Sequence, residues 1–125
     1  DIFNIFYSFN ILPIAIQLET PHGPVGIIHA DILHSSWGLF KTDLVSDNYR
    51  GQTATRALQE RNRWKHGIKI PVQGVRAVYV GHSVVSKPAV LGNVAYIDTG
   101  VTGLPVTPNG GNIGITWNAS GIFTL

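Results

Sequence analysis

Residues 79–100 read YVGHSVVSKPAVLGNVAYIDTG and hold two apolar runs, the first followed by Gly81 and His82 and the second by Asp98. With the residues before them, these runs predict a buried strand over residues 75–82 and another over residues 93–100. His82 therefore falls at the C-terminal end of a strand. There a rigid sheet fixes a side chain while the following loop leaves room for a ligand.

His29 has the same setting as His82. Residues 12–19 and 24–30 are rich in branched side chains and are separated by the turn signal TPHG, which predicts a hairpin with His29 at its far end. Neutral imidazole is the commonest protein ligand for metals, so the two histidines are candidate metal ligands. The alternative is that both are structural histidines. His22, His34 and His66 fall in loops or at a helix end, where solvated side chains are expected.

Composition limits the classes of protein that the chain can represent. The 125 residues suit a single domain over residues 1–125 with a sizeable core, and 44% hydrophobic against 13% charged residues indicates an ordered chain. A formal charge of +2 gives no electrostatic case for nucleic acid, and no apolar run reaches the ~20 residues that cross a bilayer. No secretory leader is visible, so we expect a cytoplasmic protein. The absence of cysteine excludes thiolate metal sites, and the absence of methionine indicates a processed chain or a piece of a longer one.

One main helix is predicted, over residues 53–67. Strong helix formers, basic residues near the C-terminal end and Gly67 as the stop support it. Its apolar stripe of Ala54, Ala57 and Leu58 continues to Arg61, a guanidinium on the inward face. Arg61 either pairs with a carboxylate or extends past the core, or it points at an anion.

The remaining segments give weaker signals. Residues 1–10 are aromatic and apolar without a clear period and fit a strand, a packed arm or a short helix. Residues 31–52 are predicted to form a long loop with at most short helical turns. Two short strands, GITW and GIFTL, are predicted near the end of the chain.

Three quoted segments together resemble the C-terminal half of a bacterial or phage-type serine/threonine phosphoprotein phosphatase of the metallophosphoesterase superfamily. LPIAIQLETPHGPVGIIHADI is similar to the strand pair that leads to the HA metal-ligand motif of that family. ALQERNRWKHG resembles its LLWSRERI helix segment, and AVYVGHSVVSKPAVLGNVAYIDTG resembles its GHTPV…LGNVVYIDTGA block. The resemblance covers residues 11–100 and the closing strands.

This resemblance implies a fold and a site. The fold would be α+β, with a mixed, largely antiparallel sheet of about six strands and one main helix, half of an αββα sandwich. His29 and His82 would be ligands of the second of two metals, and Arg61 would bind the substrate phosphate. Asp98 is expected to close a strand. The divalent metals, manganese, iron or zinc, would polarise the phosphoryl group and activate water for in-line attack.

The family motifs GDxHG, GDxxDRG and GNHE are missing, and they supply the other metal ligands and the acid–base histidine. The segment after Gly100 also departs from the family pattern. We therefore expect no catalytic residue in this chain, no metal cofactor unless the N-terminal half is supplied, and no hydrolase activity alone. The expected partners are that N-terminal half and a phosphorylated substrate, with no nucleic acid and no membrane.

The alternative is a non-catalytic binding or assembly module derived from the same fold. Half of a sandwich exposes strand edges that can pair with another copy, and the apolar arm in residues 1–10 could take part. This alternative predicts a homo-oligomer, and the sequon at Asn118 would fit export of such a protein.

Overall fold

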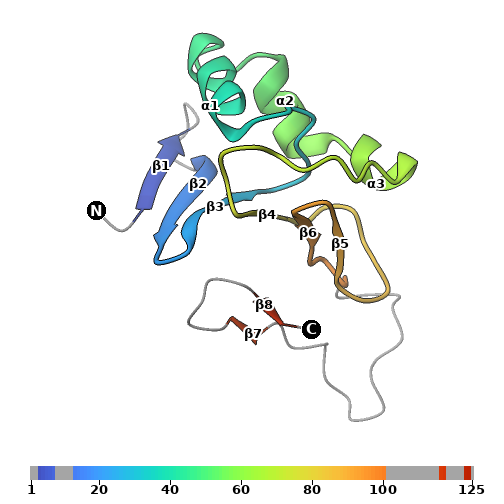
Figure 1. Cartoon of the computed structure of the whole chain (residues 1–125). Coiled ribbons are helices and arrows are strands. Elements are labelled where there is room, and N and C mark those ends of the chain that lie inside the picture. Colours follow the sequence, from blue (N-terminus) through green and yellow to red (C-terminus); the bar gives the residue numbers. More distant parts are fainter. Residues whose placement is uncertain (1–2, 8–12, 101–115, 118–122, 125) are drawn as a thin grey trace.

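The computed structural model describes residues 3–7, 13–100, 116–117 and 123–124. The strands of its main sheet lie in the order β1-β2-β3-β4-β6-β5 (Figure 1). These strands are β1 Phe3–Tyr7, β2 Pro13–Thr20, β3 Gly23–Ile28, β4 Ala77–Val80, β5 Ala89–Leu91 and β6 Val94–Tyr96. A separate antiparallel pair joins β7 Thr116–Trp117 to β8 Phe123–Thr124, within the two predicted closing strands. Residues 101–112, in the segment after Gly100 that departs from the family pattern, and the sequon at Asn118 lie outside the described residues.

The sheet is mixed, with its parallel pairs in the middle. β3 pairs parallel with β4, and β4 pairs parallel with β6, while β1–β2, β2–β3 and β5–β6 are antiparallel. The α+β class with a mixed sheet agrees with the sequence prediction. That this sheet is half of a phosphatase sandwich stays a prediction.

The β2–β3 hairpin has the predicted position. Its register runs from Ala15 opposite Ile28 to Thr20 opposite Gly23. Gly23 has φ +113°, which favours glycine, and the Thr20 hydroxyl donates to the Gly23 carbonyl at 2.6 Å. Part of the predicted arm, Phe3–Tyr7, forms β1 and extends this hairpin at its free edge.

The prediction of a loop over residues 31–52 was wrong, because helix α1 (Trp37–Ser46) lies within it. The Ser36 hydroxyl caps the helix by accepting from the Leu39 N–H at 3.0 Å. Buried Trp37, Phe40 and Leu44 recur at helical spacing. Turn-forming residues around this stripe hid the helix, whose stability comes from packing on the sheet.

The single helix predicted over residues 53–67 was also wrong, since the segment forms two helices, α2 (Gln52–Gln59) and α3 (Asn62–His66). Glu60 is extended between them, at φ −72° and ψ 147°. Its carboxylate accepts from the N–H groups of Arg61 and Asn62 at 2.9 and 3.0 Å, so a local side-chain bond competes with helix continuation. Gly67 ends α3 with φ +61°, as its position in the sequence predicted.

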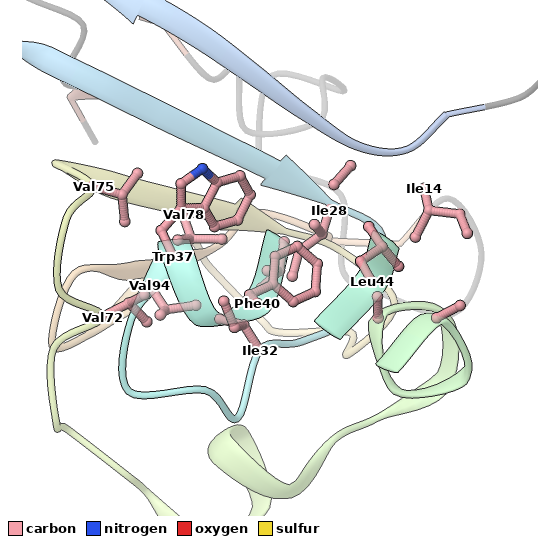
Figure 2. Packing of buried hydrophobic residues seen from close by; sticks show 14 of the residues in the cluster. Ile14, Ile28, Ile32, Trp37, Phe40, Leu44, Val72, Val75, Val78 and Val94 are labelled. Carbon is pink, nitrogen blue, oxygen red and sulfur yellow. The ribbon is translucent and has the colours of Figure 1, made fainter. Parts of the chain in front are cut away.

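The main core lies between the helices and one face of the sheet. Figure 1 shows α1 and α2 on the same side of the strands, and Figure 2 shows the α1 side chains directed at them. The largest members of this cluster include Trp37, Phe40, Leu44, Ile32 and Tyr96. The Trp37 indole N–H donates to the Gln17 amide oxygen at 2.8 Å, which satisfies its buried polar atom. Within the described chain, no helix has the length and apolar character needed to span a bilayer.

Candidate functional site

The two strand-end histidines lie together at one edge of the sheet. β3 and β4 are parallel neighbours, so their C-terminal ends meet there. The Gly81 N–H donates to the His29 carbonyl at 2.7 Å, which extends the pairing past the strands. The imidazole rings of His29 and His82 have centroids 5.0 Å apart and planes inclined by 56°. The sequence predicted that each histidine follows the C-terminal end of a strand. Because these two strands are parallel neighbours, the two rings come into contact.

The backbone of His82 adopts the left-handed region, at φ +63°. This conformation costs an L-residue roughly 1–2 kcal/mol and is usually occupied by glycine. The Asp98 carboxylate holds the bend, because it accepts from the His82 N–H at 3.0 Å. Such strain is common where a side chain is directed at a ligand.

Asp98 itself follows β6, which is parallel to β4, so a third strand ends at the same edge. Its other carboxylate oxygen accepts from the Gly100 N–H at 2.9 Å, and its backbone carbonyl accepts from the Val85 N–H at 2.9 Å. These bonds agree with the expected role of Asp98 in closing a strand. Asp98 positions His82 and the loop beyond it.

Arg61 lies close to His82, although not on the helical face expected for it. The residue is exposed and precedes α3 at the helix break. One guanidinium nitrogen, Nη2, lies 3.5 Å from the His82 carbonyl, at the outer limit of a hydrogen bond. The inward-facing arginine predicted by the stripe was therefore wrong, and the buried guanidinium is that of Arg63, 3% exposed.

The electrostatic surroundings of His82 favour its neutral form. Burial lowers its pKa below the ordinary 6.5, and the charge of Arg61 and the neighbouring His29 lower it further, while Asp98 opposes them. Neutral imidazole is the form that binds a metal. His82 is therefore available as a ligand near neutral pH.

The distance between the two rings is compatible with a shared metal ion. A metal bound at about 2.1 Å from an imidazole nitrogen lies about 3.2 Å from the ring centroid. Two imidazoles at roughly 90–110° around one ion then have centroids about 4.5–5.2 Å apart, and the observed 5.0 Å falls in this range. Across the described ranges, no three His, Asp or Glu side chains converge to hold an ion.

A buried network that the sequence did not indicate positions the start of α3. The Asp31 carboxylate accepts from the Ile32 N–H at 2.8 Å, the Arg63 N–H at 3.0 Å and the Tyr96 hydroxyl at 3.1 Å. The Arg63 guanidinium donates to the carbonyls of Ile32, Ile68 and Ile70 at 3.1, 3.1 and 2.7 Å. The one signal in the sequence for this network was that Asp31 directly follows the His29–Ala30 pair. The network fixes Arg61, two residues before Arg63, beside the histidines.

A pocket of about 470 Å³ opens next to His82 and was also missed by sequence reasoning. It is lined from two segments, α3 with the residue before it and the loop after β4, by Arg61, Trp64, Lys65, His82, Ser83 and Val84. The two segments are far apart in sequence, and the α2–α3 break that brings them together had no clear signal. The pocket brings the cationic side chains of Arg61 and Lys65 next to His82.

The other histidines lie outside this edge. His22 is exposed in the β2–β3 turn and His66 is exposed at the end of α3. The His34 ring pairs with the Asp43 carboxylate at 2.8 Å and contacts Phe40 edge-on. His22 and His66 are solvated as expected, whereas His34 is not, because its ring is only 16% exposed and is paired with Asp43.

The chain matches no protein-family model and no curated protein. The resemblance to the phosphatase family therefore stays a prediction from the quoted motifs, and the geometry at the strand ends is an independent observation about the same residues.

Proposed function

We propose that the chain is the C-terminal part of a metal-dependent phosphatase that acts on phosphate monoesters or phosphoproteins. The observation that carries the proposal is the contact between His29 and His82 at the ends of adjacent parallel strands, with Arg61 alongside. A phosphatase needs metal ligands and a phosphate-binding cation at one place. These three residues supply part of that set.

The three side chains have separate roles in this proposal. His29 and His82 would hold one divalent ion, manganese, iron or zinc, and Arg61 would bind the phosphate through its planar array of donors. The metal would supply polarisation of the phosphoryl group and activation of water. The carboxylate ligands and the acid–base group are expected from an N-terminal half, so no catalytic residue is assigned here.

A non-catalytic, self-assembling module is the second candidate. β1 and β5 are the outer strands of the sheet, and Val90 of β5 is 52% exposed. An outer strand with an exposed apolar side chain can pair with a second copy of the chain. A large, ordered, metal-free oligomer in light scattering would favour this candidate. A cytoplasmic location belongs to the phosphatase proposal, and export belongs to the assembly alternative.

The test joins this chain to the N-terminal half of a bacterial serine/threonine phosphatase that carries the three missing motifs. With manganese, the chimera is expected to hydrolyse an aryl phosphate, whereas the chain alone is expected to be inactive. His29→Ala, His82→Ala and Arg61→Gln should each lower kcat/KM by at least ~100-fold. Arg56→Gln, which changes an exposed arginine on α2, is the matched control and should have no effect.

Two outcomes would contradict the proposal. One is turnover of the aryl phosphate by the chain alone, because the site would then not depend on the missing motifs. The other is a histidine variant of an active chimera that keeps the parent activity. Circular dichroism of each variant separates loss of folding from loss of function.

A further inference from the structure

The pocket beside His82 has a cationic side and an apolar side. Arg61, just before α3, and Lys65, in the last turn of α3, are exposed, and both line the pocket. Two positive charges on one short segment attract an anionic group. Because Arg61 also approaches the His82 carbonyl, this charge lies on the side of the pocket nearest the histidine pair.

Ser83 adds a polar atom that the fold does not use. The residue is 2% exposed and lines the pocket, and its hydroxyl has no hydrogen-bond partner among the described residues. A buried hydroxyl without a partner costs roughly 1–3 kcal/mol. Native proteins rarely keep such a group unless a ligand or water bonds to it. The hydroxyl can donate to or accept from a polar atom of a ligand.

Trp64 and Val84 form the apolar side. Trp64 is 36% exposed, and its ring packs on Tyr96 with centroids 5.0 Å apart and planes inclined by 45°. Tyr96 is fully buried and its hydroxyl is bonded to Asp31, so the support under the indole is rigid. Val84 is 53% exposed. An exposed indole on a fixed support, opposite an aliphatic side chain, suits a flat apolar group.

We propose that this pocket binds the organic part of an aryl phosphate, with the ring on Trp64 and the phosphate toward Arg61. The inference rests on the proposed function and names its substrate class, a phosphorylated phenol in place of a phosphorylated aliphatic alcohol. Lys65 adds positive charge for the anionic end, and the Ser83 hydroxyl bonds to a polar atom of the ligand. Val84 contacts the edge of the ring.

The inference is tested by measuring how tightly phosphate compounds bind to the chain in the absence of metal. The indole N–H signal of Trp64 and the backbone amide signals of Ser83 and Val84, which remain in every variant, are followed by NMR in buffer containing EDTA while phenyl phosphate, methyl phosphate or inorganic phosphate is added to the chain. Phenyl phosphate is expected to bind about tenfold more tightly than methyl phosphate, the size of one good aromatic contact. Trp64→Leu should remove this preference, and Val84→Ser should reduce it by about threefold.

Matched variants separate the two sides of the pocket. Arg61→Gln should weaken phenyl and methyl phosphate equally, because both carry the phosphate, and Arg56→Gln should weaken neither. Leu39→Ser changes an exposed apolar residue of α1 outside the pocket and should keep the preference. Amide spectra show whether each variant is folded.

Equal binding of phenyl and methyl phosphate, or binding of neither, would overturn the inference. Because the assay contains no metal, neither result bears on the proposed metal site, which is tested separately by metal binding to the histidines. Conversely, a preference for phenyl phosphate together with histidines that bind no metal would contradict the proposed function while locating a ligand pocket.

Discussion

His82 illustrates at the scale of one residue how the sheet positions a side chain. Its left-handed backbone would suit glycine better, yet a histidine occupies the position, and Asp98 supplies the hydrogen bond that holds the bend. A strained non-glycine residue persists only where the surrounding structure fixes it. The strain is therefore expected to be measurable as lost stability.

Replacing His82 tests this point. His82→Gly should be about 1 kcal/mol more stable than His82→Ala, because both lose the ring and only glycine relieves the φ of +63°. Urea denaturation measures the difference. The same pair at His29, which is outside the left-handed region, should show the reverse order or no difference. An alanine variant at position 82 as stable as the glycine variant would show that the bend is unstrained.

Asp31 provides a second residue-scale prediction, through pH. Burial raises its pKa above the ordinary 3.8, although the bonds from Ile32, Arg63 and Tyr96 lower it in part. In the interval between 3.8 and the raised pKa, the folded chain binds more protons than the unfolded chain. The Asp31 contribution to the free energy of unfolding therefore falls as pH rises through this interval.

Asp31→Asn should lower the free energy of unfolding by about 2–3 kcal/mol near neutral pH, because the Arg63 backbone N–H loses its carboxylate acceptor and the Arg63 guanidinium loses a nearby negative charge. The variant lacks the titrating carboxyl. The difference in the free energy of unfolding between the parent and the variant should therefore be largest near pH 4 and become smaller as pH rises. Urea denaturation across this range measures it. If this difference in stability grew as pH rises, the pKa of Asp31 would be lowered by folding and not raised.

At the scale of elements, the contact of α1 with the sheet depends on a glycine, Gly26 of β3, which has no side chain. A Cβ placed on Gly26 of β3 would lie 2.6–2.9 Å from three carbons of the Trp37 ring. Trp37 is 1% exposed and is anchored to Gln17, so it has little room to move. The strand and the helix therefore approach closely only because position 26 is glycine.

Gly26→Ala should destabilise the fold by about 1–3 kcal/mol through overpacking. Gly38→Ala is the matched control, because Gly38 lies in α1, is exposed and has only the Ser36 hydroxyl near its Cβ position, at 3.9 Å. This control should gain up to about 1 kcal/mol from helix propensity. Thermal unfolding distinguishes the two, and a neutral Gly26→Ala would mean that Trp37 repacks freely.

The sequence was most informative where local chemistry decides structure. The Thr20–Gly23 turn, the strand-end positions of His29 and His82, and the stop at Gly67 follow from turn residues, apolar runs and glycine. α1 was missed because its stability comes from a stripe of three large side chains on the sheet. The break at Glu60 was missed because helix formers flank it. As a result, Arg61 was predicted to face inward, whereas Arg63 is the buried arginine and Arg61 is exposed.

At the scale of the whole molecule, the parallel centre of the sheet creates the site. β3, β4 and β6 end at one edge, so His29, His82 and Asp98 meet although 69 positions separate the first from the last. Sequence alone placed each residue at a strand end, but the order of the strands was needed to bring them together. We propose that this edge of the sheet binds a divalent metal through the two histidines.

Metal titration of the chain tests that claim most directly. Zinc is added to ¹⁵N-labelled protein near pH 7.5, and the imidazole signals of the five histidines are followed. His29 and His82 should respond first and together, each alanine variant should abolish the response of the other, and His22→Ala should leave it unchanged. Five histidines that respond alike, or a His82→Ala variant in which His29 still binds zinc as tightly, would contradict the account.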